Sequence, residues 1–529
     1  MMANQSTTHT RTYHGVFTAT AAKFPHELAL CFKGKHPQKL TYRELAFHSD
    51  LAAAALEDAG CKKGMYIPLL LSRGMDCVIW ALGILKTGAA VVPLAEDTPQ
   101  PRIDYIIGDT KASIIVAHPG LAQKCIGQNC FIVEPDAWEE TPVDEGLVCP
   151  DREALRGTEA LNDTQVLNDP DPSPMMVYYT SGTTGQPKGV VISHENVLSF
   201  ASRHNRFNNI SQGTRVCAYA TVSFDAFLMD IYAPLLSGAR VYLLDKASRI
   251  SLVGLHQYLM RNKIKLMFLT TRLGEAYMTS FDNPHLTRLL TGGEVLRKFT
   301  PRQYEVFNLY GPTETTAYVT ATKIIEPMDD FPLGHALPGI NVMLLDKEDR
   351  PCEPGTLGEI CISGSQVSSG YLNRPKETAR VFTDNPLYNP ETEPKEFARI
   401  YRTGDQGQTG QDHILYFRGR MDHQVKIRGF RIEPVEIEAT MLRHSDLNHA
   451  CVTPGTKITG ETYLSAYFSR AKKDISSKEF IPELRTYLQE NLPGQMVPQY
   501  IMEVDDFPLN ANGKVDVTKL PEPLRQEGR

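Results

Sequence analysis

The chain has 529 residues, of which 42% are hydrophobic and 22% are charged, and its formal net charge is -7. This length allows more than one domain with a large buried core, and the charge excludes a broad basic surface for nucleic acid or for an anionic membrane. The N-terminus lacks the apolar core of a signal peptide, and no run approaches the roughly 18 apolar residues of a membrane span.

The ten cysteines are scattered along the chain without a C-x-x-C pair. The closest two are Cys125 and Cys130. This spacing argues against a metal site or a disulfide framework and favours a reducing compartment. We therefore expect a cytoplasmic protein that contacts neither nucleic acid nor membrane.

The first third of the chain alternates strand and helix patterns. A helix is expected after Thr41, because Glu44 three residues later completes a capping box. Further elements follow as strand 66–71, helix 75–86, strand 89–94 and strand 114–117. Such alternation predicts a parallel, doubly wound sheet. The acidic, Pro-rich stretch 134–173 predicts a surface excursion.

A loop rich in glycine and threonine follows the apolar strand pattern of residues 175–179. It reads T-S-G-T-T-G-Q-P-K-G over residues 180–189. Glycines let backbone N–H groups approach a ligand, hydroxyls add neutral donors, and Lys188 adds one cation. That chemistry suits a polyphosphate, whereas an ordinary hairpin turn is the plainer alternative. Pro187 excludes a P-loop of the G-x-x-x-x-G-K-[ST] type, because the lysine there opens a helix.

A second strand–helix unit is expected between residues 190 and 310. Its elements are strand 190–193, a helix from His194, strand 215–222, a helix ending at Leu236, strand 240–244, helix 252–261, strand 266–269, helix 272–278, strand 288–294 with a glycine turn, and strand 307–310. The segment G-P-T-E-T-T, residues 311–316, follows the last strand. Ligands bind beyond the carboxyl ends of such strands, so these loops should share one face.

The pattern changes after residue 322. Short apolar runs separated by Pro/Gly turns predict a β-rich subdomain to about residue 418, and residues 419–424 form a polar hinge candidate. A small α+β unit is expected next, with strand 425–427, helix 434–442, strands 450–453 and 462–468, helix 477–490 and a turn-rich loop at 508–514. The predicted fold class is α/β: a large N-terminal domain (1–421) of doubly wound βαβ sheets plus a β-rich subdomain, and a small α+β C-terminal domain (422–529).

Several motifs in order resemble the adenylate-forming superfamily, which includes acyl- and aryl-CoA ligases, luciferases and adenylation domains of nonribosomal peptide synthetases. They are T-S-G-T-T-G-Q-P-K-G, N-L-Y-G-P-T-E, Y-R-T-G-D, G-R-M-D-H-Q-V-K-I-R-G-F-R-I-E-P-V-E-I-E and N-G-K-V-D. The resemblance runs from residue 40 to residue 516. It implies a large domain and a small C-terminal lid domain that is mobile about a hinge, where Asp422 matches the hinge aspartate.

The resemblance also implies residues that bind ATP and Mg²⁺. Expected ATP contacts are Thr180, Ser181, Thr183, Thr184, Lys188, Tyr310, Thr313, Asp405 and Arg420. Among them Tyr310 resembles the adenine-stacking aromatic, and Asp405 the carboxylate that accepts both ribose hydroxyls. Glu314 resembles the Mg²⁺ ligand, a hard oxygen donor for a hard cation. Lys514 resembles the lysine that reaches between the substrate carboxylate and the α-phosphate; without the resemblance it would be read as a surface lysine.

The reaction implied is attack of a carboxylate on the α-phosphorus of ATP, which gives an acyl-AMP and pyrophosphate. Lys188, Glu314 and Lys514 would carry catalysis by positioning and by stabilising charge. The family then transfers the acyl group to a thiol. Since no carrier segment or condensation motif follows Lys514, we expect a free-standing enzyme whose acceptor is the phosphopantetheine of a separate carrier protein.

Phe224-Asp225-Ala226 matches the branch of the family that activates amino acids, in which the aspartate pairs with the α-ammonium group. The expected substrate pocket is Asp225, Ala226, Met229, Phe268, Leu290, Gly292, Leu309, Ala317, Tyr318 and Lys514. Nothing ionised lies between Asp225 and Lys514, so a charged substrate side chain would be buried unpaired. Met229, Phe268 and Tyr318 crowd the pocket. We expect a small or medium aliphatic amino acid such as proline, alanine or valine.

Three alternatives remain open. An acyl- or aryl-CoA ligase would use the same fold with CoA as acceptor. A D-alanine–carrier protein ligase is also possible, since Ser223-Phe224-Asp225 and Met229-Asp230-Ile231-Tyr232 resemble that group. The third, an adenylate-binding regulator without catalysis, is opposed by the intact Lys188, Glu314, Asp405 and Lys514.

Overall fold

The structure is a computed structural model. It describes residues 12–33, 38–125, 131–133, 172–182, 184–245, 249, 251–422, 424–427, 429–457, 459, 461–470, 475–508 and 515–523. The chain divides into two compact units. The larger unit comprises residues 1–96, 107–178 and 189–421, and the smaller unit comprises residues 97–106, 179–188 and 422–529. The surface excursion predicted for 134–173 falls, except for its last two residues, outside the described residues.

A seven-stranded sheet with the order β18-β8-β7-β4-β3-β5-β6 forms in the described chain. Its strands are β3 (Tyr66–Leu70), β4 (Ala90–Leu94), β5 (Ile114–Ala117), β6 (Phe131–Val133), β7 (Pro174–Thr180), β8 (Lys188–Ser193) and β18 (Gly370–Tyr371). The pairs β3–β4, β3–β5, β4–β7 and β5–β6 are parallel, as the strand–helix alternation predicted.

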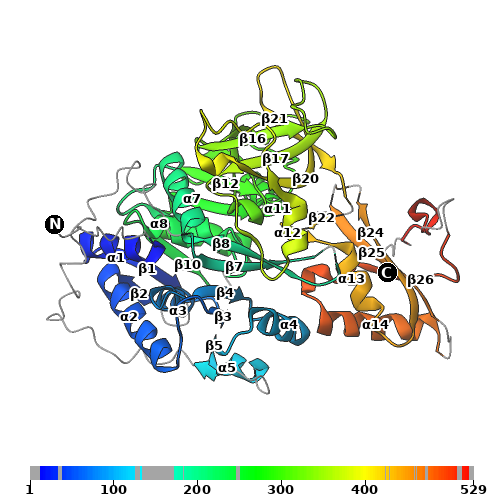
Figure 1. Ribbon diagram of the computed structural model, residues 1–529, viewed down its shortest axis with the longest axis horizontal. Coiled ribbons are helices and arrows are strands. Elements are labelled where there is room, and N and C mark those ends of the chain that lie inside the picture. The colour runs from blue at the N-terminus through cyan, green and yellow to red at the C-terminus, as the bar shows by residue number, and fades with distance from the viewer. Residues whose placement is uncertain are drawn as a thin grey trace, which may run out of the picture. The chain divides into compact units, whose positions relative to one another are not determined.

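Two helices, α2 (Tyr42–Asp58) and α3 (Met75–Lys86), lie side by side next to this sheet (Figure 1). The predicted capping box of α2 is confirmed: Thr41 N–H donates to Glu44 at 2.7 Å, and Glu44 N–H donates to Thr41 Oγ1 at 3.2 Å. Helix α3 is followed by Gly88 at φ +78°, a conformation that glycine adopts without strain. These local signals lie in the sequence itself, so the bounds of both helices were predicted closely.

A nine-stranded sheet has the order β15-β14-β13-β12-β11-β9-β10-β1-β2 in the described chain. Its strands are β1 (Leu28–Lys33), β2 (Gln38–Thr41), β9 (Arg215–Ala218), β10 (Arg240–Leu244), β11 (Leu266–Thr270), β12 (Arg288–Gly292), β13 (Glu305–Tyr310), β14 (Thr320–Ile324) and β15 (His335–Ala336). Neighbours from β13 to β1 are parallel, while β14, β15 and β2 are antiparallel edges. The helices predicted in this region are α7 (His194–Phe207), α10 (Leu252–Asn262) and α11 (Thr271–Ser280).

The sequence prediction was wrong about the region after β9. The predicted strand 215–222 ends at Ala218, and the predicted helix up to Leu236 is a π-helix at Leu228–Tyr232 followed by the short α8 (Ala233–Leu235). Here side chains, rather than a neighbouring strand, form the hydrogen bonds of the backbone N–H and carbonyl groups. Asp230 accepts the N–H groups of Tyr219 and Ala220 at 2.8 and 2.7 Å. Arg73 donates to the carbonyls of Ala218 and Ala220.

Most strands of the predicted β-rich region form a five-stranded sheet of the described chain, with β21 pairing β20 beside the order β16-β17-β20-β19 (Figure 1). Two short strands of the region, β15 and β18, instead belong to the nine- and seven-stranded sheets. Its strands are β16 (Ile340–Leu345), β17 (Gly358–Gly364), β19 (Phe382–Asp384), β20 (Arg399–Thr409) and β21 (Leu415–Arg420). Gly419 and Arg420 belong to β21 and pair with β20, so the polar segment predicted as a hinge at 419–424 begins inside a strand. The backbone N–H of Met421 also donates to the carbonyl of Gly404 on β20 at 2.9 Å, so only the part of the predicted hinge after Met421 is without this pairing among the described residues.

The smaller unit contains the predicted α+β elements. They are β22 (Val425–Ile427), β23 (Phe430–Ile432), α13 (Pro434–Met441), β24 (Leu447–Thr456), β25 (Thr462–Arg470), α14 (Ser477–Asn491) and β26 (Tyr500–Glu503). One apolar cluster, which includes Ile437, Phe468 and Phe480, forms its core. The remaining helical elements within the described residues are α1 (Tyr13–Lys23), α4 (Gln100–Thr110), α5 (Pro119–Ala122), α12 (Pro375–Val381) and the 3-10 turns Gln123–Cys125, Thr313–Thr315, Lys395–Phe397, Gly494–Met496 and Val517–Lys519.

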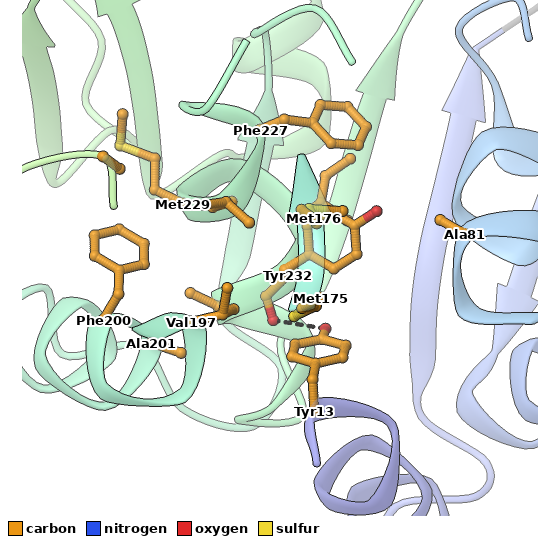
Figure 2. Close-up of a cluster of buried hydrophobic side chains, with 14 of the residues drawn as sticks. Tyr13, Ala81, Met175, Met176, Val197, Phe200, Ala201, Phe227, Met229 and Tyr232 are labelled. Atoms are coloured by element: carbon orange, nitrogen blue, oxygen red, sulfur yellow. Dashed lines mark hydrogen bonds between the residues drawn. The ribbon is translucent and has the colours of Figure 1, made fainter. Parts of the chain in front are cut away.

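The main apolar core of the larger unit joins both large sheets. Figure 2 shows part of this core, in which Tyr13 of α1 lies next to Tyr232; Val197 and Phe200 of α7 and Met229 of the π-helix belong to the same cluster. The Tyr13 hydroxyl donates to the carbonyl of Tyr232 at 2.9 Å, which fixes α1 to the end of the π-helix (Figure 2). Within the described residues, none of the helices has the length and apolar character needed to cross a membrane.

Candidate active site

A buried carboxylate in the larger unit, itself a predicted nucleotide contact, binds two other predicted nucleotide contacts. Asp405 on β20 is 1% exposed and accepts a 2.7 Å hydrogen bond from the hydroxyl of Tyr310 at the end of β13. Arg420 on β21 also donates to Asp405, and its second nitrogen donates to the carbonyl of Thr403 at 3.2 Å. Burial, together with the Asp405 carboxylate, raises the pKa of Tyr310 well above its ordinary value, so the hydroxyl stays protonated and donates. The structure therefore brings these three predicted residues together.

Glu314 lies one short turn beyond β13. Its side chain is fully buried and accepts a 2.7 Å hydrogen bond from the hydroxyl of Tyr371 on β18. Its backbone carbonyl accepts the N–H of Ser368 at 2.8 Å. Carboxylate oxygens bind Mg²⁺ well, and Mg²⁺ is usually held by one or two carboxylates together with substrate phosphates. No group of three or more potential metal ligands was found among the described residues, and the Mg²⁺ role of Glu314 stays a prediction.

Most predicted substrate residues belong to the main apolar core. Ala226, Met229, Phe268, Leu290, Leu309, Ala317 and Tyr318 are all buried members of it. Phe268 faces Leu290 across β11–β12, and Leu290 faces Phe307 across β12–β13. The alternate residues Met267 and Leu289 lie in the other core cluster, on the opposite side of the sheet. Phe268, whose assignment had no motif to anchor it, is thus on the same face as the other pocket residues.

Gly292 pairs with Leu309 where β12 meets β13. A Cβ atom at Gly292 would lie 2.6 Å from the carbonyl oxygen of Leu309. Real Cβ atoms do not approach backbone oxygens this closely, so only glycine allows the two strands to pack here. Close packing of β12 against β13 therefore explains why a glycine stands at this position of the predicted pocket.

Asp225 lies just before the π-helix and is 8% exposed. Its carbonyl accepts the N–H of Leu228 at 2.9 Å, which begins the helical turn that carries Met229. The Asp225 carboxylate is also close enough to raise the pKa of the buried Tyr178, although burial of Tyr178 is the larger cause. π-Helical turns recur at functional sites, and this one joins the predicted amine partner to a predicted pocket residue.

The hydroxyl of Tyr318 is used inside the protein. It lies 3.0 Å from Nδ1 of His204 and accepts from the side-chain amide of Asn208 at 3.4 Å. Burial lowers the pKa of His204 to about 3, so the imidazole is neutral at physiological pH. The Tyr318 hydroxyl is therefore engaged within the larger unit, and the neighbouring histidine adds no charge.

Several residues that shape this region carried no signal in the sequence. Tyr371 donates to Glu314 from 57 positions away in the sequence. Arg73, in the loop after β3, donates to the carbonyl of Ala220 beyond β9. Burial raises the pKa of Asp230 to about 7, partly opposed by its backbone hydrogen bonds and by Arg73. Lone tyrosine, arginine and aspartate residues are common, and only the fold shows what they contact.

The Gly/Thr loop is described within the smaller unit. The N–H of Gly182 donates to Glu436 at 3.1 Å, and Ser181 Oγ donates to the carbonyl of Arg431 at 2.7 Å. Glu436 also pairs with Arg102 at 2.7 Å. Backbone N–H groups of this loop can therefore bind an anionic oxygen, as a polyphosphate loop requires.

Other predicted loop residues differ in their surroundings. Lys188 is 5% exposed and lies near Glu433, whose pKa is raised by burial against the opposing effect of Arg431 and Lys188. Thr184 is exposed, and the buried hydroxyl of Thr180 has no hydrogen-bond partner among the residues that the structure describes. Thr183 and Lys514 lie outside the described residues.

The chain matches two family models. Residues 17–372 match "AMP-binding enzyme", and residues 436–514 match "AMP-binding enzyme C-terminal domain". Bacitracin synthase 1 of Bacillus licheniformis is 33% identical over 98% of this chain, and tyrocidine synthase 2 of Brevibacillus parabrevis is 32% identical over 98%. These alignments cover 9% and 14% of the relatives, so the chain spans only a small part of the length of the curated proteins it matches.

Solved structures with a similar fold include the following two. An artificially fused adenylation–PCP di-domain from Klebsiella oxytoca has a TM-score of 0.76 at 22% identity, covering 94% of both chains. The four-domain nonribosomal peptide synthetase AB3403, bound to AMP and glycine, has a TM-score of 0.63 at 28% identity, covering 98% of this chain and 37% of the other. The first likeness shows the fold, which agrees with the α/β class and the large and small domains expected from the sequence.

Proposed function

The chain belongs to the family of AMP-binding enzymes, and on this premise we propose that it activates a neutral amino acid to an aminoacyl-AMP, with ATP as the second substrate and pyrophosphate as the product. The observation that carries the proposal is the continuity of β13 and the turn after it. Leu309 lies in the apolar cluster, Tyr310 binds Asp405, and Glu314 follows after a short turn. One segment thus supplies a residue of the proposed amino-acid pocket, a residue of the proposed nucleotide site and the proposed metal ligand.

The residues have separate roles in this proposal. Asp405, which Tyr310 and Arg420 hold in place, accepts the ribose hydroxyls through its two carboxylate oxygens. The 180–189 loop, with Lys188, binds the phosphates that depart. Mg²⁺ bound at Glu314 would neutralise phosphate charge. Lys514 offsets the repulsion between the substrate carboxylate and the α-phosphate, where negative charge develops.

Asp225 is the proposed partner of the substrate α-ammonium group. The other described residues of the proposed amino-acid pocket are apolar, except for the hydroxyl of Tyr318, which is hydrogen-bonded to His204. Asp225 is therefore the acidic residue of this pocket. A carboxylate in this position favours an amino acid over a plain fatty or aryl acid. With Asp225 paired to the α-ammonium group, a charged substrate side chain would meet no further counter-charge among the described members of this pocket, and burying it unpaired costs several kcal/mol. We therefore favour small or medium aliphatic amino acids such as proline, alanine or valine.

The proposed acceptor for the second step is the phosphopantetheine thiol of a carrier protein in nonribosomal peptide synthesis. Similarity to peptide synthetases and to an adenylation–PCP di-domain supports this proposal. A thiol attacks the acyl carbon of the mixed anhydride, the C–O bond to AMP breaks, and AMP leaves. Asp422 is proposed as the hinge about which the C-terminal domain turns between the two reaction steps. Its side chain accepts the N–H of Gln424 at 3.2 Å, a bond typical of a turn.

ATP–pyrophosphate exchange tests the proposal. The panel should contain the proteinogenic amino acids, D-alanine and other D-enantiomers, and simple fatty and aryl acids. We expect exchange with a few neutral aliphatic amino acids. Exchange that D-alanine alone supports would favour the D-alanine–carrier ligase, and exchange with fatty or aryl acids alone would overturn amino-acid activation. Lys514→Ala should lower exchange by at least about 100-fold with an unchanged circular dichroism spectrum.

A further inference from the structure

Two consecutive residues next to the proposed pocket have left-handed backbone conformations. Thr316 has φ +56° and Ala317 has φ +71°. Residues with a side chain seldom adopt such angles, and adjacent pairs persist only where surrounding contacts hold them. This turn joins Glu314 to Tyr318, so its shape decides where both of the pocket residues Ala317 and Tyr318 lie.

Gln366 supplies those contacts from the segment between β17 and β18. Its side-chain nitrogen donates to the carbonyls of Thr315, Thr316 and Tyr318 at 3.2, 3.4 and 3.1 Å. Its backbone carbonyl accepts the Thr316 hydroxyl at 2.8 Å. The side chain is fully buried. One amide therefore bridges three backbone carbonyls on both sides of the left-handed pair.

The orientation of this amide is fixed by a second residue. Arg203 Nη1 donates to Gln366 Oε1 at 3.5 Å, and Arg203 also binds the carbonyls of Pro338 and Gly339 at 2.7 and 3.2 Å. With the amide oxygen directed to a guanidinium, the NH₂ group must face the carbonyls. A glutamate would place an oxygen against three carbonyl oxygens, and an apolar side chain would leave three buried acceptors without this donor.

We propose that Gln366 is a positioning residue for substrate selection: it holds the Thr316–Ala317 turn so that Ala317 and Tyr318 define one wall of the amino-acid pocket. The inference rests on the proposed function, because Ala317 and Tyr318 were assigned to the pocket there. The same segment also holds Glu314, but through the backbone N–H of Ser368. Replacing the Gln366 side chain leaves that contact in place, so its effect should fall on the amino acid rather than on ATP.

The test compares Gln366→Glu and Gln366→Met with Gln408→Glu in the exchange assay. Gln408 lies on β20 and donates to the carbonyl of Gly355, far in sequence from the turn, so it is a matched control for the same chemical change. For both Gln366 variants we expect the KM for the preferred amino acid to rise about tenfold and the preference between two aliphatic amino acids of different size to change at least about fivefold. The KM for ATP should stay within about twofold, and Gln408→Glu should match the wild type.

Equal increases in the KM for ATP and for the amino acid, or an unchanged preference between amino acids, would contradict the inference. Failure of both Gln366 variants to fold, while Gln408→Glu folds, would also contradict it, because Gln366 would then serve the fold in general rather than the pocket. Failure of the proposed function is distinguishable, since the wild-type protein would then support no exchange with any amino acid.

Discussion

The hydroxyl of Tyr310 donates a 2.7 Å hydrogen bond to the buried carboxylate of Asp405, across 95 positions of sequence. Tyr310 ends a strand of the nine-stranded sheet, whereas Asp405 lies on β20 of the five-stranded sheet. The contact therefore ties the β-rich region to the strand whose neighbouring residues line the proposed pocket. It also holds the carboxylate that we propose for ribose binding.

Tyr310→Phe should weaken ATP binding while leaving the fold intact. The change removes one hydrogen bond to an ionised group, worth about 1.5–3 kcal/mol, while Arg420 still holds Asp405. We expect the KM for ATP to rise about tenfold and the KM for the amino acid to change little. Tyr388→Phe, which removes the hydroxyl that donates to the carbonyl of Glu393, is the control. An unchanged KM for ATP would refute a role for the Tyr310–Asp405 contact.

Tyr371→Phe tests the support of Glu314. The phenylalanine ring would keep the edge contact with Phe382, whose ring centroid is 5.6 Å away, but would remove the hydroxyl that binds Glu314. We expect the Mg²⁺ concentration for half-maximal exchange to rise by about three- to tenfold, and Glu314→Gln to lower the rate by at least about 100-fold. If Tyr371→Phe lowers the rate at every Mg²⁺ concentration by the same factor, the tyrosine does not act through the metal.

His204 should make the protein sensitive to acid. Burial lowers its pKa to about 3 from an ordinary value of 6.5, so between these values the unfolded state binds the extra proton. The stability that the neutral, buried His204 contributes is fully present above pH 6.5. It is lost as the pH falls towards 3, and the free energy of unfolding then decreases by up to about 1.4 kcal/mol per pH unit. His204→Gln should therefore reduce the slope of the unfolding free energy against pH in this window. The exposed His26→Gln is the control, and equal slopes for both variants would contradict the account.

Some contacts of the structure could be predicted from the sequence alone. Thr41 and Glu44 cap α2 as predicted because both ends of that interaction lie within one turn. Tyr310, Asp405 and Arg420 were grouped by resemblance, and the structure brings them together. Interactions inside a short motif, or between motifs of a known family, are therefore accessible before the fold is known.

Contacts that depend on packing between distant segments were not predicted. The strand expected to reach residue 222 ends at Ala218, because Asp230 and Arg73 bind the backbone of Ala220 beyond it. Gln366 and Tyr371 act on residues about 50 positions away, and neither has a local pattern that marks it. Periodicity reports which face of a strand or helix is buried, but it does not identify the polar partner on another element.

Amino-acid activation is tested most directly at Asp225. The measurement is ATP–pyrophosphate exchange with the best amino acid and with the same acid lacking its amino group, for the wild type and for Asp225→Asn. The wild type should prefer the amino acid by at least about 100-fold in kcat/KM, and Asp225→Asn should lose most of that preference because the buried ammonium loses its counter-charge. Equal use of the two acids by the wild type, or an unchanged preference in Asp225→Asn, would contradict the proposed function.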